Sequence, residues 1–248
     1  FWAAFGTQLK YGAVADYGAH KDVLQDLLLF WSSKEGKNTT LASYKDRMPE
    51  DQPYYYYACG ESVDKIAKLP QVERILDKGY EILYCTEDVD DFVMKALGEI
   101  DGKQFKSVNE EDALPQTEEE KKAAEEKSEK SKQTLDFVKK TLGDKVKDVR
   151  LSDNLGSHPV SVVPAEGMTF EMEKYFKRVD PNSGMKADRI LEFNADHPIF
   201  AKLQIAVAQD EKKAEDLVKI LYTQALLMAG LSVENAGEYT DLVCSLIG

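Results

Sequence analysis

The chain offers few residues suited to catalysis or metal binding, because its 248 residues include only three cysteines and three histidines. Their positions do not follow the short spacings of zinc ligands, and no segment combines a nucleophile, a base and a group to orient that base. We expect His158 and His197 to be structural, and Cys59 and Cys85, which end predicted strands, to be buried and unreactive. The third histidine is His20, and the third cysteine is Cys244.

The charge balance excludes several classes of partner. The formal net charge is −13, so a nucleic-acid backbone would be repelled. With 45 acidic residues in the chain, neighbouring carboxylates such as Asp90–Asp91 and Glu110–Glu111 do not indicate an acid–base pair. Gly60 stands alone after its predicted strand, without the glycine pattern of a phosphate loop. No apolar run approaches the ~20 residues of a membrane span. The sparse, odd number of cysteines favours a cytoplasmic location.

One segment, GMTFEMEKYF at residues 167–176, gathers methionine and aromatic residues among charges. On a helix, with 100° between successive residues, its apolar face consists of Met168, Met172, Tyr175 and Phe176. Phe170 falls on the opposite side. An ordinary core contact explains such a stripe. The alternative is a binding surface, because methionine adapts to varied partners and Phe170 cannot share a core with the stripe.

The elements that position these residues suggest two domains, at 1–112 and 113–248. Residues 1–50 read as a helical segment, since Leu24, Leu27, Leu28 and Trp31 recur at helical spacing. Residues 53–110 alternate strands and helices, which predicts a small parallel sheet with right-handed crossovers. The elements predicted there are strand 54–59, a helix capped by Ser62, strand 80–85, helix 88–100 and strand 103–108.

The second domain begins after the polar boundary 109–116 with a charged helix, 118–132, that becomes amphipathic and ends at Gly143. The predicted elements that follow are strands 146–152 and 157–164 around a hairpin-type turn DNLG, strand 188–194, and helices 201–209, 214–231 and 238–247. The fold class is therefore α/β plus α+β, with a helical segment and a small α/β/α part followed by an α+β domain that ends in helices.

The last two helices predict a homodimer. The helix 214–231 is apolar around nearly its whole circumference, so it must be covered on all sides. The final helix has a single apolar stripe and is too narrow to cover it, whereas a second copy of the pair could, as a four-helix bundle. Burial within one chain is the alternative. The predicted interface residues are Leu217, Ile220, Leu221, Leu227, Met228, Leu231, Tyr239, Leu242, Val243, Leu246 and Ile247.

Several blocks together resemble the heat-shock protein 90 chaperone family, bacterial HtpG type, in order and over essentially the whole chain. They are YYYYACGES (54–62), KGYEILYCTEDVDDF (78–92), DGKQFKSV (101–108), LGDKVKDVRLS (142–152), LEFNADHPIF (191–200) and LYTQALLMAGLSVEN (221–235).

The resemblance implies that this chain is a fragment, which its start without an initiator Met also suggests. Residues 1–112 match the distal part of the family's middle domain, and residues 113–248 match its C-terminal dimerisation domain. ATP and Mg belong to an N-terminal domain that lies upstream in the family, so we expect no cofactor and no ATP hydrolysis by this fragment alone.

The resemblance also implies a role for the methionine and aromatic stripe. In bacterial members a helix at this place contacts non-native client proteins. The positions that match are Met168, Phe170, Met172, Tyr175 and Phe176, with Asp91, Phe92 and Lys95 on a nearby middle-domain helix. Further implications are a cytoplasmic stress-response chaperone, a homodimer, and a partnership of the middle domain with the heat-shock protein 70 system. The alternative is a structural homodimerisation module without client contact.

Overall fold

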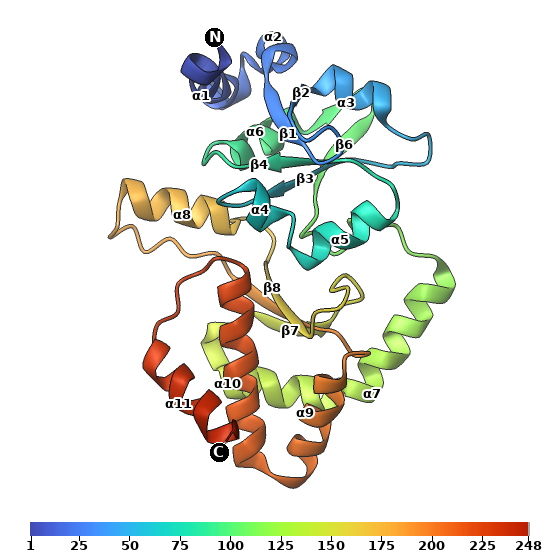
Figure 1. The fold of residues 1–248 in the computed structure, drawn as a ribbon, viewed down its shortest axis with the longest axis vertical. Helices are drawn as coiled ribbons and strands as arrows, with labels where there is room; N and C mark the ends of the chain where they lie inside the picture. Colours follow the sequence, from blue (N-terminus) through green and yellow to red (C-terminus); the bar gives the residue numbers. More distant parts are fainter. Residues whose placement is uncertain (248) are drawn as a thin grey trace. The chain divides into compact units, whose positions relative to one another are not determined.

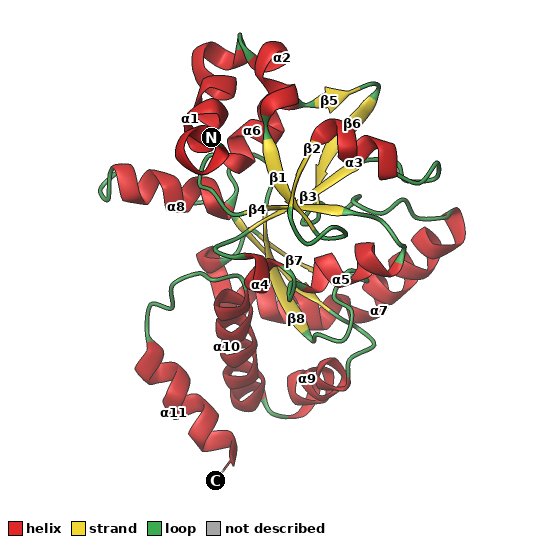
Figure 2. Ribbon diagram, turned by 45° about the horizontal axis from the view of Figure 1, so that its top comes forward, coloured by secondary structure: helices red, strands yellow, loops and turns green. Residues whose placement is uncertain are grey.

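The computed structural model describes residues 1–247, apart from the side chain of Ile247. It consists of helices and mixed sheets (Figures 1 and 2), which confirms the predicted α/β plus α+β class. The chain forms two compact units. The first contains residues 1–113 and 171–185, and the second contains residues 114–170 together with the chain from Lys186 onward. The segment 171–185 thus groups with the first unit, although it follows the predicted domain boundary.

The first unit is built on a six-stranded sheet of order β2-β1-β4-β3-β6-β5. Its strands are β1 (Leu29–Ser32), β2 (Asn38–Thr40), β3 (Tyr55–Cys59), β4 (Ile82–Cys85), β5 (Glu99–Ile100) and β6 (Lys103–Ser107). Strand β3 runs parallel to β4 and β6, as the alternation of strands and helices predicts. Residues Tyr55 to Ala58 are all buried, since both faces of a parallel sheet are covered.

The helices of the first unit surround this sheet. They are α1 (Trp2–Val14), η1 (Ala15–Gly18), α2 (Lys21–Leu24), η2 (Gln25–Leu27), α3 (Leu41–Arg47), α4 (Val63–Ile66), α5 (Pro70–Asp77), α6 (Asp90–Leu97) and α8 (Phe170–Val179) from Glu171 onward. Ser62 caps α4 by accepting a hydrogen bond from the Lys65 amide, as predicted. Helix α6 ends at Leu97, three residues before the predicted end, and is followed by Gly98, where φ is +67°.

The prediction of a helical segment 1–50 is wrong for residues 29–40, which form β1, a turn and β2, whereas α3 (Leu41–Arg47) is helical. Trp31 lies on β1 opposite both Asn38 and Tyr84, so this short segment pairs with β2 and β4. Alternate residues Phe30 and Ser32 are buried on one side of the strand. Helical spacing of leucines was therefore overridden by strand pairing with segments distant in sequence, a long-range effect that local propensity does not reveal.

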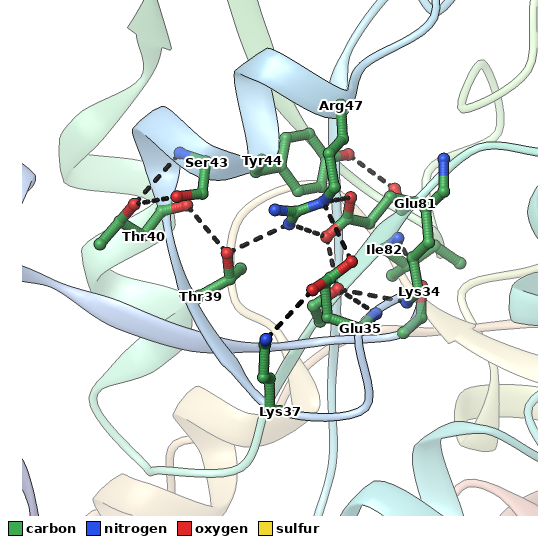
Figure 3. A network of polar contacts seen from close by, with 12 residues as sticks. Lys34, Glu35, Lys37, Thr39, Thr40, Ser43, Tyr44, Arg47, Glu81 and Ile82 are labelled. Atoms are coloured by element: carbon green, nitrogen blue, oxygen red, sulfur yellow. Dashed lines mark hydrogen bonds and ion pairs between the residues drawn. The ribbon is translucent and has the colours of Figure 1, made fainter.

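A buried ion pair ties α3 to the sheet of the first unit (Figure 3). The guanidinium of Arg47 donates to both carboxylate oxygens of Glu81, at 3.0 and 2.7 Å. The Glu81 side chain is 1% exposed, and Ser32 Oγ donates a further hydrogen bond to it. Arg47 also donates to Thr39 Oγ1, so the interaction fixes α3 relative to β1 and β2.

The second unit contains a three-stranded sheet of order β7-β9-β8 and the remaining helices. Its elements are α7 (Glu118–Leu142), η3 (Gly143–Lys145), β7 (Asp148–Leu151), β8 (Val160–Pro164), β9 (Arg189–Phe193), α9 (Pro198–Gln209), α10 (Glu211–Met228) and α11 (Ala236–Ile247). Thr117 and Glu120 form a capping box at the start of α7, and Gly143 ends it. His197 caps α9 through Nδ1, in keeping with its predicted structural role.

The predicted hairpin of residues 146–164 is wrong in its pairing, although both strands exist. β9 lies between β7 and β8, parallel to the first and antiparallel to the second. The connection 152–159 is long enough to separate the two strands and admit β9. The core of this unit packs α7, α9 and α10 against the sheet, with Leu191, Phe193 and Phe200 at most 1% exposed.

Candidate functional site

Helix α8 carries the methionine and aromatic stripe, and its two apolar sides have different surroundings. Phe170, its first residue, is 7% exposed and belongs to the core of the second unit. From Glu171 onward the helix belongs to the first unit. Lys174 pairs with Glu171 at 2.8 Å along the helix, and Lys177 pairs with Glu173 at 2.6 Å. These i,i+3 and i,i+4 pairs support the helix, and the carboxylate of Glu173 is buried.

Within the first unit, Phe92 of α6 contacts Tyr175 and Phe176 of α8, and we call these three residues the aromatic cluster. The ring centroids lie 5.4 Å apart for Phe92 and Tyr175, and 6.1 Å apart for Phe92 and Phe176. Tyr175 and Phe176 are 5.6 Å apart, and all three pairs meet edge to face. This arrangement is favourable because the positive edge of one ring meets the negative face of the next. All three side chains are half-buried.

Two further contacts join α8 to α6. The Nζ atom of Lys95 lies 3.7 Å from the Sδ atom of Met172, which is also half-buried. The guanidinium of Arg178 lies 5.8 Å from the centre of the Tyr175 ring and forms an ion pair with Asp88, just before α6. Tyr11 on α1 lies near these residues. Its pKa is raised mainly by burial and, to a smaller extent, by the electrostatic effect of Tyr175 and Asp88. The surface is thus apolar at its centre and charged at its margin.

Three residues predicted to contact clients do not lie on this surface. Phe170 is in the core of the second unit, so its ring is not available to a partner. Met168 is half-buried and packs against the same core. Asp91 is 3% exposed and accepts a hydrogen bond from Tyr57 Oη at 3.4 Å. The structure therefore groups only Phe92, Lys95, Met172, Tyr175 and Phe176 of the predicted set.

Beneath α6, a buried lysine supports the surface, and sequence reasoning missed it. Lys10 of α1 is 3% exposed, and its Nζ atom lies 2.8 Å from Glu87 and 2.6 Å from Asp90. Burial alone would raise the pKa of Glu87, but hydrogen bonds from Lys10 and Thr7 lower it. Burial raises the pKa of Asp90. The acidic run EDVDD at residues 87–91 is visible in the sequence and could indicate a nearby cation. Its partner, Lys10, is 77 positions away from Glu87, so the sequence does not reveal the pair.

The second predicted surface, on α10 and α11, is smaller than the sequence suggested. Four predicted interface residues of the α10 region, Leu217, Ile220, Leu221 and Leu231, are buried within their own unit at 4–9% exposure. Burial within one chain, the alternative, therefore explains most of the apolar circumference of α10. Leu227 and Leu246 are 53% and 45% exposed. Met228, Tyr239, Leu242 and Val243 are half-buried, and the Ile247 side chain lies outside the described residues.

The turn after β3 is where a phosphate loop would begin in a parallel sheet. A Cβ atom at Gly60 would lie 2.8 Å from Cγ1 of Ile66, which is fully buried. Gly60 thus allows α4 to pack closely against the strand. Within the described part of the chain, His, Cys, Asp and Glu side chains form no group of three or more suited to a metal ion. The helices described also include none with the length and apolar character of a membrane span.

Comparison with known proteins identifies relatives over the whole chain. A family model described as "Hsp90 protein" matches residues 1–248. "Chaperone protein HtpG" of Bacillus subtilis (strain 168) is 46% identical over 247 residues, which is 100% of this chain and 40% of that protein. The proteins of the same name from Clostridium botulinum (strain Langeland / NCTC 10281 / Type F) and Clostridium perfringens (strain 13 / Type A) are 44% and 45% identical, with 40% and 39% of their lengths covered. The chain therefore spans about two fifths of these relatives.

Proposed function

The chain belongs to the Hsp90 protein family, and on this premise we propose that it is the client-binding and dimerising part of a molecular chaperone. Its partners are non-native polypeptides and a second copy of itself. The contact surface consists of Met172, Tyr175 and Phe176 on α8 with Phe92 and Lys95 on α6.

The observation that carries this proposal is the aromatic cluster with Met172 beside it. These four large side chains are half-buried rather than sealed in a core. An unfolded client exposes apolar side chains, and each Å² that it buries here contributes about 25 cal/mol. The unbranched thioether of Met172 adapts to different partners, which suits a protein that binds many sequences. The charged residues at the margin, such as Lys95 and Arg178, keep the surface soluble when it is empty.

We propose that dimerisation uses the apolar residues that the second unit leaves accessible. These are Leu227 and Met228 at the end of α10, and Leu242, Val243 and Leu246 on α11. A dimer presents the client surface twice, so one weak contact raises the effective concentration for the other. We further infer that the longer protein supplies ATP hydrolysis and works in the cytoplasm with the heat-shock protein 70 system.

The proposal is tested by titrating a fluorescently labelled, chemically unfolded model protein with this chain and following anisotropy. We expect Met172→Asp to weaken client binding while circular dichroism and light scattering show an unchanged fold and mass. The matched control is Leu76→Asp. It places the same charge at another partly exposed apolar residue of the first unit, which lies on α5 rather than on α8. Client binding by Met172→Asp equal to that of the wild type would overturn the proposal. If Met172→Asp unfolds, Tyr175→Lys replaces it.

A homodimerisation module without client contact is the alternative function. The one-sided stripe of α11, with Leu246 45% exposed, favours it as strongly as it favours a chaperone. The same titration separates the two, because a purely structural module would show no saturable client binding by the wild type, the Leu76 control or the Met172 variant.

A further inference from the structure

The apolar side of α8 is partly covered by its own chain in this structure. Phe92 packs edge to face on Tyr175 and Phe176, and Lys95 reaches the sulfur of Met172. The three α8 side chains proposed to receive a client therefore already have partners on α6, and α8 lies beside α6 in the first unit (Figure 1). A client that binds this surface must compete with these contacts.

The Asp88–Arg178 ion pair is placed to hold α8 in this position. Asp88 precedes the first residue of α6, and Arg178 lies in the last turn of α8, so each charge also has the favourable sign for its helix dipole. The Arg178 guanidinium reaches the Tyr175 ring as well. In the same acidic run, Glu87 and Asp90 pair with Lys10 of α1, and Asp91 accepts from Tyr57 of β3. Asp88, in contrast, pairs with Arg178 of α8.

The pair is exposed to solvent, with side-chain exposures of 60% for Arg178 and 39% for Asp88. Such a pair is weak and sensitive to salt, as a releasable contact requires.

The segments that flank α8 each contain a glycine with positive φ, Gly167 at +107° and Gly184 at +66°. Phe170 at the start of α8 stays in the core of the second unit, so the part that can move is the helix from Glu171 onward, and its movement breaks no strand.

We propose that the Asp88–Arg178 ion pair is a latch that holds α8 docked on α6 and covers the client surface until a client or high salt releases it. Release exposes both halves of the surface, the α8 stripe and Phe92. The covering role rests on the proposed client-binding function, whereas the latch itself is a property of the folded chain alone.

The latch is tested first without any client, by hydrogen exchange of the peptide that spans α8. We expect Asp88→Ala and Arg178→Ala each to speed exchange about two- to fivefold, the range for loss of a weak exposed pair. Raising the salt concentration should speed exchange in the wild type and have little further effect in either variant. The reversed pair, Asp88→Arg with Arg178→Asp, should slow exchange again relative to the single variants, but only in part, because the swapped charges oppose both helix dipoles and the contact of Arg178 with the Tyr175 ring is lost. The control Lys45→Ala removes the comparably exposed pair with Asp101 and should leave α8 unchanged.

Client anisotropy with the same variants then tests the covering role. We expect the two single variants to bind the unfolded model protein about two- to fivefold more tightly than the wild type, because more of the chain is in the competent state. Unchanged exchange in both single variants would overturn the latch. Faster exchange with unchanged or weaker client binding would overturn the covering role. Failure of the proposed function appears separately, as client binding by Met172→Asp equal to that of the wild type.

Discussion

The Nζ atom of Lys10 lies 2.6 Å from Oδ1 of Asp90, and both side chains are almost fully buried. The two residues join α1 to the first turn of α6, the helix that carries Phe92. The ammonium also lies 4.7 Å from the centre of the Phe30 ring, where the ring face attracts a cation. Lys10 is thus a structural charge, and its loss would disturb α6, which carries part of the proposed client surface.

We predict that Lys10→Met lowers the free energy of unfolding of the first unit by about 3 kcal/mol. The substitution preserves the aliphatic volume but leaves Asp90 as a buried carboxylate without its cation, and breaking a buried pair in this way is strongly destabilising. Urea denaturation followed by circular dichroism measures the difference. A change no larger than that for an exposed lysine would contradict the structural role of this pair.

The loss of unfolding free energy caused by Lys10→Met should be smaller at lower pH. Without the cation, the pKa of Asp90, which burial already raises, rises further above its unfolded value. A carboxyl group with a raised pKa destabilises the fold above that pKa, where it is ionised, and this penalty disappears as pH falls through it. The stability difference from the wild type should therefore be smaller at about pH 5.5 than at about pH 8. Urea titrations at the two pH values test the sign.

We predict that Arg47→Met also costs about 3 kcal/mol in stability, since it leaves the carboxylate of Glu81 buried beside Ser32 without its cation. Arg47→Lys should recover only part of the loss, because one ammonium cannot donate the two parallel hydrogen bonds that the guanidinium makes. Thermal unfolding of both variants checks this order. The control is Lys45→Ala, on the solvent side of the same helix, which should change the midpoint little.

We predict that Phe92→Ala weakens client binding about tenfold, the loss typical of a central aromatic anchor, and that Phe92→Trp retains binding. Phe170→Ala should instead lower the free energy of unfolding of the second unit by about 3 kcal/mol, as a cavity in a core does. Its client affinity should match that of the wild type wherever it is folded. Anisotropy and urea denaturation of the three variants measure both effects. Equal client affinities for Phe92→Ala and wild type would remove Phe92 from the surface.

We predict that Leu227→Asp and Leu246→Asp dissociate the proposed dimer without loss of fold, because both leucines are exposed within their own chain. Leu221→Ala should instead lower folding stability without affecting association. It lies in the core at 4% exposure, so it should cost about 2–5 kcal/mol in folding and leave the association of the folded protein intact. Sedimentation velocity gives the mass of each variant. A monomeric wild type would contradict the proposal of a dimer.

We predict that one thiol of the three reacts quickly with a thiol reagent in the folded protein. Cys244 is exposed on α11, and Cys85 is buried as expected, whereas Cys59 is half-buried rather than buried. The interaction with Cys85 and then burial raise the pKa of Cys59, and burial raises the pKa of Cys85, so both stay protonated and slow. Counting modified thiols by mass spectrometry before and after denaturation checks this. Fast loss of Cys59 or Cys85 at neutral pH would show that the strand ends open.

Local chemistry predicted much of the framework. The aromatic run YYYYAC forms β3, Ser62 and Thr117 cap their helices, and Gly143 ends α7, because these signals act between residues a few positions apart. The aromatic and methionine stripe of residues 168–176 was likewise visible as a periodic pattern. Where the pattern failed, at Trp31 and in the expected hairpin, the decisive partner was a strand distant in sequence.

For this protein, the sequence by itself determined which side chains are apolar and on which helix faces they lie. It also supported the family resemblance that the comparisons confirm. Only the tertiary structure decided which of those faces are covered. Phe170, Leu217 and Leu221 lie in a core, whereas Tyr175 and Leu227 remain accessible to different degrees. The physical reason is that periodicity describes one element, whereas burial depends on what the rest of the chain places opposite it.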